Sequence, residues 1–390
     1  MKQVYIIDYI RTPIAKFQGG LSEVRADDLA AIVLKEIVKR NPQIPAEEIE
    51  DVILGCANQA GEDNRNVARM ASLLAELPIK IGGETVNRLC ASGMAAISNA
   101  YRAIAIGEGE IYLAGGVEQM TRAPYVLSKS AQPFGRDVQL FDSSFGWRFI
   151  NPKMKELYGV DGMGETAENL AEIYKISREA QDEFALLSQQ KATSAQNSGR
   201  LAQEIVNVEI PQKKGEPKIF SEDEFVKPDT TLDKLAKLRP AFKKEGGSVT
   251  AGNSSGLNDG AAAMILASED AVKKYNLKPL AKIISSAVVG VEPRIMGIGP
   301  VEATKKALSR ANLSLEDMDI IELNEAFAAQ SLSVLQELGI DAKDERLNPN
   351  GGAIALGHPL GMSGTRIVGT AALELQKKNK KYALCTLCIG

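Results

Sequence analysis

The sequence is poor in histidine, cysteine and aromatic residues, and these shortages exclude several classes of protein. Its 390 residues include one histidine, His358, and four cysteines, and aromatic residues make up 5% of the chain. Four cysteines in so long a chain do not make the disulfide framework of a small secreted domain. We therefore expect a reducing, cytoplasmic compartment, and any mechanism that uses an imidazole must use His358.

Long apolar runs and a large net charge are also absent. No stretch approaches the ~18 uninterrupted apolar residues that a membrane span needs, and the apolar run near Met1 is too short for a signal peptide. The chain has 46 basic and 50 acidic residues, a net charge of -4. We expect neither nucleic acid nor a membrane surface as the main partner. A local basic patch is still able to bind a small polyanion.

Alternating strand and helix patterns indicate an α/β fold. Short apolar runs predict strands at residues 4–8, 52–56 and 111–114. Apolar residues at helical spacing predict helices at residues 26–40, 62–78 and 94–106. Strands that alternate with helices indicate a mostly parallel sheet.

The same pattern begins again after residue 280. It predicts a strand at 280–289, a helix at 301–311 and strands at 320–323 and 382–387. Residues 315–323 repeat the acidic turn and strand of residues 46–54 at an offset of about 270 residues, as in duplicated folds. We therefore predict two similar α/β halves with a site between them, where loops converge beyond the strand ends.

Polar and aromatic loops interrupt the first half. From this change in composition we predict a first half at residues 1–119 plus 248–270, an inserted loop domain at 120–247 and a second half at 271–390.

Cys90 lies where a short strand meets a predicted helix. Backbone N–H groups and the helix dipole favour a nucleophilic thiolate at such a position. The small neighbours Ala91, Ser92 and Gly93 would let a substrate carbonyl approach closely. On this segment alone, a buried cysteine that acts as a small apolar residue is the better interpretation.

Three further candidates follow strands or lie in loops of the second half. Asn324 follows a strand, His358 lies in the glycine-rich loop 348–359, and Cys388 ends the final strand. Each has a structural alternative, as a helix cap, an ordinary loop residue or a core residue respectively. Together, two thiols and one imidazole are what acyl transfer through a thioester requires.

Four segments resemble the signature segments of the thiolases: 87–94, 324–328, 351–359 and 386–390. This resemblance implies the five-layer αβαβα thiolase fold, with two duplicated halves and a loop domain inserted in the first. Within the family, segments 55–66 and 146–152 resemble 3-oxoadipyl-CoA thiolases. The implied reaction cleaves 3-oxoadipyl-CoA with CoA to acetyl-CoA and succinyl-CoA. Alternatives are an acetoacetyl-CoA thiolase, a general β-oxidation thiolase and a catalytically silent acyl-CoA carrier.

The resemblance also implies roles for the candidate residues. Cys90 carries the acyl group, His358 raises its thiolate character, and Cys388 is the acid and base. One oxyanion is bound by His358 and a water held by Asn324. The other is bound by the backbone N–H groups of Cys90 and Gly390.

The substrate CoA needs a long binding tunnel. By resemblance, Ser255 and Ala251 line the pantetheine part, Met163 is a further CoA-binding candidate, and Lys227 and Lys234 are candidates for the phosphates. For either lysine, a solvated basic loop is the simpler alternative. We expect no permanently bound cofactor and no metal. The expected partners are acyl-CoA and CoA, in a homodimer or homotetramer.

The sequence departs from the family pattern at two places. Gly162 precedes Met163, where acetoacetyl-CoA thiolases commonly have histidine, and this disfavours that subtype. The family usually continues beyond the position of Gly390 into a final strand, so we expect the chain to be truncated. A terminal carboxylate there would oppose the negative charge of an oxyanion.

Two other motifs are weak. Residues 297–302 resemble a dinucleotide-binding turn but lack its third glycine and an acidic ribose ligand. Cys385 and Cys388 lack further Cys or His partners for a zinc site. On a strand their side chains would also point to opposite faces.

Overall fold

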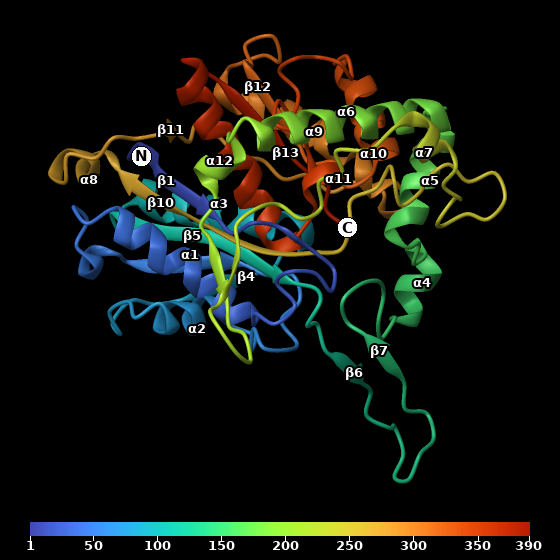
Figure 1. Cartoon of the computed structure of the whole chain (residues 1–390), viewed down its shortest axis with the longest axis horizontal. Helices are drawn as coiled ribbons and strands as arrows, with labels where there is room; N and C mark the ends of the chain where they lie inside the picture. Colours follow the sequence, from blue (N-terminus) through green and yellow to red (C-terminus); the bar gives the residue numbers. More distant parts are fainter.

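The computed structural model describes residues 1–390, and a seven-stranded sheet lies at its centre (Figure 1). The strand order is β11-β1-β10-β5-β3-β4, with β2 paired to one end of β10. The strands are β1 (Val4–Arg11), β2 (Ala15–Lys16), β3 (Asp51–Gly55), β4 (Glu84–Val86), β5 (Ile111–Gln119), β10 (Asn258–Ser268) and β11 (Ala281–Lys282).

The sheet is mixed, so the prediction of a mostly parallel sheet is wrong. β3 pairs in parallel with β4 and β5, but β10 runs antiparallel to both β1 and β5. The reason lies in the inserted segment, which leaves the sheet after Gln119 and returns at the same end, where Asp259 pairs with Gln119. β10 therefore has to run back along β5.

Helices and a second, smaller sheet complete five layers. Helices α1 (Ala26–Arg40) and α2 (Val67–Leu74) pack on one face of the large sheet, and α3 (Ser92–Ile106) and α12 (Leu360–Lys378) pack on the other. The parallel pair β12 (Ile320–Leu323) and β13 (Ala383–Thr386) lies beyond α12. Outside that pair are α9 (Gly299–Ala311) and α10 (Ala328–Leu338). Figure 1 shows this succession, with the second sheet above the first.

The second half repeats part of the first. β12 pairs in parallel with β13 as β3 pairs with β5. The strand predicted at residues 280–289 is wrong for most of its length, because only Ala281–Lys282 form a strand, and it joins β1 of the large sheet. β1 begins at Val4, so the pairing ends where the N–H of Ile283 donates to Val4 O at 3.0 Å. The predicted helix at 62–78 is likewise shorter, because Asn66 caps α2 by accepting the N–H of Arg69.

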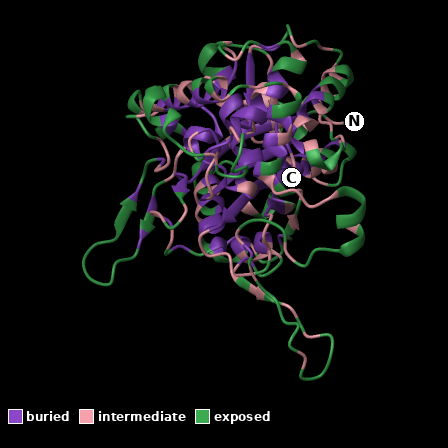
Figure 2. Cartoon of the chain, turned by 90° about the vertical axis from the view of Figure 1, so that its right-hand side faces the viewer, coloured by how far each residue is buried: buried purple, intermediate pink, exposed green.

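The segment between β5 and β10 contains short elements around one long helix. They are β6 (Tyr125–Leu127), β7 (Leu140–Asp142), α4 (Pro152–Tyr158), α5 (Met163–Ile173), α6 (Arg178–Asn197), β8 (Val208–Ile210), β9 (Lys218–Phe220) and α7 (Leu232–Ala236). The β6–β7 hairpin projects from the body and is largely exposed (Figure 2). The two remaining helices are α8 (Glu269–Lys274) and α11 (Ala353–Leu356). None of the helices combines the length and apolarity needed to cross a bilayer.

A buried ion network ties this segment to the first sheet. The guanidinium of Arg11 donates to Asp223 at 2.7 and 2.8 Å and to Glu204 at 2.7 Å, and all three side chains are fully buried. Arg200 also donates to Glu204, at 3.0 Å. Because an unpaired buried charge is costly, each carboxylate keeps its part of the segment against β1.

Glycines let backbones of the two halves touch at the centre of the molecule. A Cβ at Gly361, in the first turn of α12, would overlap the carbonyl oxygen of Val117 in β5. A Cβ at Gly364 would overlap the backbone N of Met94 in α3. This close approach brings the start of α12 against the start of α3, so the loops before the two helices meet.

We predict that Gly361→Ala destabilises the protein by about 1–3 kcal/mol, because overpacking forces the α12 backbone away from β5. The matched control is Gly290→Ala, since Gly290 has a negative φ and no atom within 4 Å of the added Cβ. Chemical denaturation should show a change within about 0.5 kcal/mol for the control. Equal stability of the two variants would contradict the packing argument.

Candidate active site

Cys90 lies in a 3₁₀ turn, Leu89–Ala91, that leads directly into α3. The Ser92 hydroxyl accepts the N–H of Arg88 and donates to Leu89 O, which fixes this turn. The Cys90 side chain is buried, and burial raises the pKa of its thiol to about 11, against the opposing effect of N–H groups from Gly390 and Cys90 itself. The helix start is as predicted, but its N–H groups do not outweigh desolvation. The thiol therefore needs a base.

His358 follows α11 and is buried by the start of α12. Its backbone N–H donates to Asn258 at 2.9 Å. Its ring nitrogens face two different partners, Ser363 Oγ at 2.6 Å from Nδ1 and Asn324 Nδ2 at 3.4 Å from Nε2. Burial, together with the positive charge of Arg366, lowers the pKa of His358 to about 3. The imidazole is therefore neutral at pH 7 and able to accept a proton.

Asn324 lies just beyond β12, and its backbone N–H donates to Thr386 O of β13 at 3.0 Å. The side chain is fully buried, and Oδ1 has no hydrogen-bond partner in the protein. A buried amide oxygen without a donor is costly. Oδ1 can therefore accept a hydrogen bond from a donor that binds beside Asn324, such as a water or a substrate group.

Cys388, Gly390 and Met163 lie next to one another, close to Cys90. Burial raises the pKa of the Cys388 thiol, and the nearby Cys90 raises it further. The N–H of Gly390 points at Cys90, and a Cβ on Gly390 would overlap the sulfur of Met163. Cys90 is thus close enough to affect the ionisation of Cys388, although the two residues lie in different halves of the chain.

The predicted CoA-binding residues are less closely grouped. Ser255 is half-buried, and its N–H donates to Ala326 O, two residues from Asn324. Ala251 is exposed in the same loop. Lys234 forms an ion pair with Asp229 at 2.5 Å, so its ammonium group already has a counter-charge.

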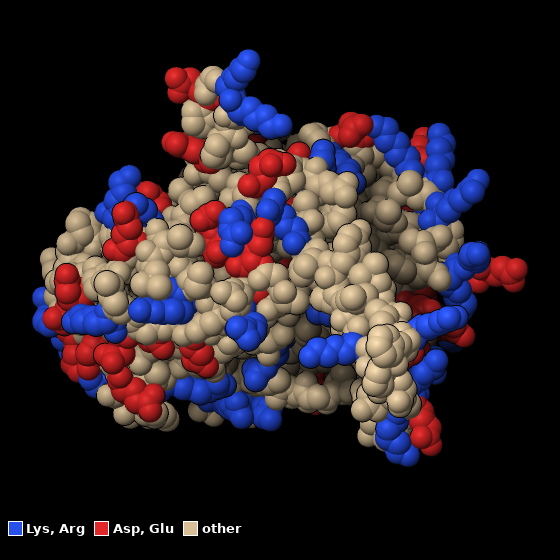
Figure 3. Space-filling view, turned by 90° about the horizontal axis from the view of Figure 1, so that it is seen from below, with Lys and Arg blue, Asp and Glu red and all other residues tan.

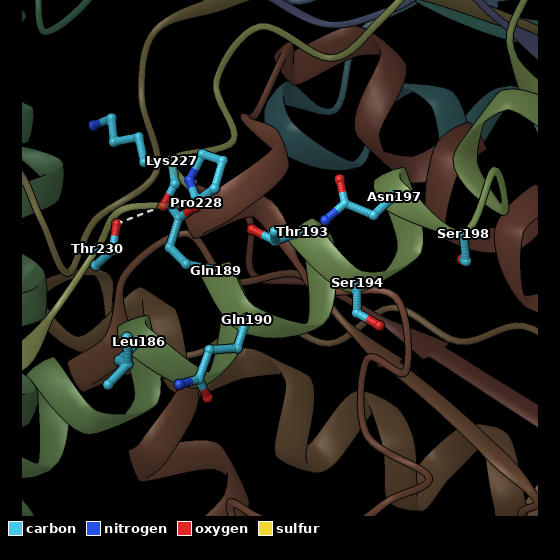
Figure 4. A pocket seen from close by; sticks show the side chains of 10 residues that line it. All are labelled: Leu186, Gln189, Gln190, Thr193, Ser194, Asn197, Ser198, Lys227, Pro228 and Thr230. Carbon is cyan, nitrogen blue, oxygen red and sulfur yellow. Dashed lines mark hydrogen bonds between the residues drawn. The ribbon is translucent and has the colours of Figure 1, made fainter.

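Lys227 lies beside a hollow of about 570 Å³ between its own loop and α6. Figure 4 shows Thr193 of α6 on the side of Pro228 and Thr230, whereas the Lys227 side chain extends away from the helix. The Lys227 ammonium lies 4.7 Å from the centre of the Phe225 ring. Basic and acidic side chains are interspersed over the face seen in Figure 3.

Sequence reasoning missed three residues that hold these loops. Glu118, at the end of β5, accepts the N–H groups of Ala57, Asn58 and Gly361 at 3.0, 3.0 and 2.8 Å. Burial raises the pKa of Glu118 to about 7. The others are Asn258 and Ser363, the partners of His358. The strand-end position of Glu118 was a usable signal, whereas the partners of His358 are set by tertiary contacts.

The fold and the site define an enzyme of acyl transfer through a thiol, and comparisons name its family. The family model described as "Thiolase, N-terminal domain" matches residues 4–270, and "Thiolase, C-terminal domain" matches residues 277–390. The chain belongs to the thiolase family of acyltransferases.

The chain is also similar to individual thiolases along its full length. The chain is 58% identical to the 3-oxoadipyl-CoA/3-oxo-5,6-dehydrosuberyl-CoA thiolase of Escherichia coli strain K12, over 100% of this chain and 97% of the relative. It is 59% identical to the beta-ketoadipyl-CoA thiolase of Pseudomonas knackmussii, over 100% and 96% respectively. Human mitochondrial 3-ketoacyl-CoA thiolase, solved in complex with CoA, is 42% identical with a TM-score of 0.90. That match covers 100% of this chain and 95% of the human one.

We predict that the single imidazole stays neutral across the range where histidine ordinarily titrates. Its pKa lies far below the usual 6.5, so its contribution to stability is complete above pH 6.5 and is lost as the pH falls from 6.5 towards 3. Proton NMR of the His358 ring should show one unchanging signal from pH 8 to about pH 5. The urea-unfolded chain is the control, and its signal should titrate near pH 6.5. A midpoint between pH 6 and 7 in the folded protein would refute the assignment.

Proposed function

We propose that this thiolase cleaves 3-oxoadipyl-CoA with CoA, through an acyl-enzyme on Cys90. The proposal rests on two adjoining buried groups. In the first, Cys90 lies close enough to Cys388 to affect its ionisation. In the second, the neutral His358 lies beside the unpartnered amide of Asn324, whose backbone N–H donates to Thr386, two residues before Cys388. The choice of acyl chain rests on the two relatives at 58% and 59% identity, whose names specify this substrate. Segments 55–66 and 146–152 support the same choice.

In the first half-reaction, the Cys90 thiol gives its proton to Nε2 of His358. The thiolate attacks the 3-keto carbon, and the bond between carbons 2 and 3 breaks. The electron pair of that bond forms the enolate of acetyl-CoA. The enolate then takes a proton from Cys388. The four-carbon acyl group, succinyl, stays on Cys90 as a thioester.

In the second half-reaction, the Cys388 thiolate removes the proton of CoA. The CoA thiolate attacks the acyl carbon, succinyl-CoA leaves, and the Cys90 sulfur regains its proton from His358. Both thiols therefore return to their starting state. Their raised pKa values suit this cycle, because each thiol holds its proton until a partner takes it.

Two sets of donors support the negative charge that develops on oxygen. The N–H groups of Cys90 and Gly390 already point at the Cys90 sulfur, and the oxyanion of the tetrahedral intermediate forms on the carbonyl oxygen beside that sulfur. Protonated His358 donates from Nε2 to the enolate oxygen. The free Oδ1 of Asn324 is suited to accept from a water that binds the same oxygen.

CoA is bound as a substrate along the inserted segment. In this proposal, Ser255, Ala251 and Met163 line the path of the pantetheine arm, and Lys227 and Lys234 face its phosphates. Binding to Lys234 would require the ammonium to exchange Asp229 for phosphate. The domain bounds remain those predicted from the sequence, residues 1–119 plus 248–270, 120–247 and 271–390.

The proposed compartment is the cytoplasm, and the proposed assembly is a homodimer or homotetramer. All four cysteines are free thiols, as a cytoplasmic enzyme with two reactive cysteines requires. The projecting β6–β7 hairpin exposes Tyr125, Leu127 and Leu140 by 72%, 64% and 64%. Such an apolar arm favours the expected homodimer or homotetramer.

We predict that Cys90→Ser lowers thiolysis by about 10³-fold or more, because the acyl group loses its nucleophile. Cys388→Ser should still acylate Cys90 but lose condensation. Mass spectrometry after incubation with acetyl-CoA measures acylation at residue 90, and separate assays measure thiolysis and condensation. Cys385→Ser is the matched control because the Cys385 thiol donates to Ile367 O and takes no part in the proposed proton transfers. An unmodified Cys90 peptide in active enzyme would reject the mechanism.

Substrate choice needs a separate measurement. We predict a higher kcat/KM for 3-oxoadipyl-CoA than for acetoacetyl-CoA, compared in the direction of thiolysis. A preference for acetoacetyl-CoA would instead identify the acetoacetyl-CoA subtype. Absence of thiolysis with either substrate, together with tight CoA binding, would identify a silent carrier.

A further inference from the structure

His358 has a buried partner, Ser363, to which the proposed reaction gives no role. Ser363 lies in the first turn of α12, five residues after His358, and is 2% exposed. Its Oγ is 2.6 Å from Nδ1 of the imidazole, on the opposite side of the ring from Asn324.

The hydrogen bonds around the ring determine which nitrogen carries the proton. The Ser363 hydroxyl donates its only proton to Pro359 O at 2.9 Å, so Oγ is left to accept from Nδ1–H. On the other side, the amide Nδ2 of Asn324 is a donor, and a protonated Nε2 would set two donors against each other. Both contacts therefore require the proton on Nδ1 and a lone pair on Nε2.

No carboxylate takes part in this arrangement. Neither ring nitrogen hydrogen-bonds to Asp or Glu, and the charged group that acts on the ring is Arg366, which is itself paired with Glu322 at 3.0 Å. A neutral hydroxyl orients the ring without stabilising the imidazolium. The imidazolium can therefore return its proton readily when the Cys90 sulfur needs it at the end of the cycle.

We propose that Ser363 is a positioning residue, which holds His358 in the Nδ1–H tautomer and thereby keeps Nε2 unprotonated, as the proposed proton transfer from Cys90 requires. The proposal deepens the proposed function and rests on it for the role of Nε2. Without the hydroxyl, a buried Nδ1–H would lack an acceptor. The ring would then shift to the Nε2–H tautomer, which cannot act as a base towards Cys90.

A direct test uses the fact that the chain has only one histidine. With ¹⁵N-labelled histidine, two-dimensional NMR of the whole protein gives one pair of ring-nitrogen signals. We expect a protonated Nδ1 and an unprotonated Nε2 at pH 7. A protonated Nε2 in the wild-type protein would overturn the proposal without reference to any activity.

Ser363→Ala and a control variant then test whether Ser363 sets the tautomer of His358. The control is Ser333→Ala in α10, because buried Ser333 makes the same bond to the carbonyl four residues earlier, Ala329 O at 2.8 Å. We expect Ser363→Ala to raise the Nε2–H fraction and to lower kcat by about 10-fold or more, with KM nearly unchanged. Ser363→Thr, which keeps the hydroxyl, should keep the tautomer.

The outcomes separate the two proposals. An unchanged tautomer and kcat in Ser363→Ala would overturn the positioning role, as would an equal effect of Ser333→Ala. A wild-type protein that has the Nδ1–H tautomer but no thiolysis would instead reject the proposed function and leave the tautomer assignment standing.

Discussion

The close contact between α3 and α12 is the constraint on which the site depends. Glycines at positions 361 and 364 let α12 approach β5 and α3 until backbone atoms touch. Cys90 precedes one of these helices and His358 precedes the other, so the contact joins a thiol from the first half with an imidazole from the second. Glu118 reinforces it, because the carboxylate binds N–H groups on both sides.

Burial then decides the chemistry of the cluster. Desolvation raises the pKa of both thiols and lowers the pKa of His358, so all three side chains are neutral at pH 7. A neutral site suits proton transfers that must be reversed within one turnover. Directed N–H groups, such as that of Gly390, supply the polarity that bulk water would otherwise provide.

Sequence patterns predicted much of the fold but failed where the structure depends on pairing between strands that are far apart in the sequence. α1 begins and ends at the predicted residues, because its apolar stripe and flanking polar residues are local signals. The direction of β10 was not predictable in that way, since it depends on where the inserted segment returns. The strand predicted after Leu280 shortened to Ala281–Lys282, because a strand needs a neighbour and periodicity cannot supply one.

The sequence by itself determined the family and the order of the elements, and it predicted Cys90, His358, Asn324 and Cys388 as site residues, because these depend on local patterns and on motif order. Only the tertiary structure decided the ionisation of the thiols and the tautomer of the imidazole. Burial and the contact with Ser363 are long-range or rotamer-dependent properties that no spacing of residues encodes. The tertiary structure also decided that Lys234 pairs with Asp229, because an exposed ammonium group pairs with the carboxylate that the loop brings near it.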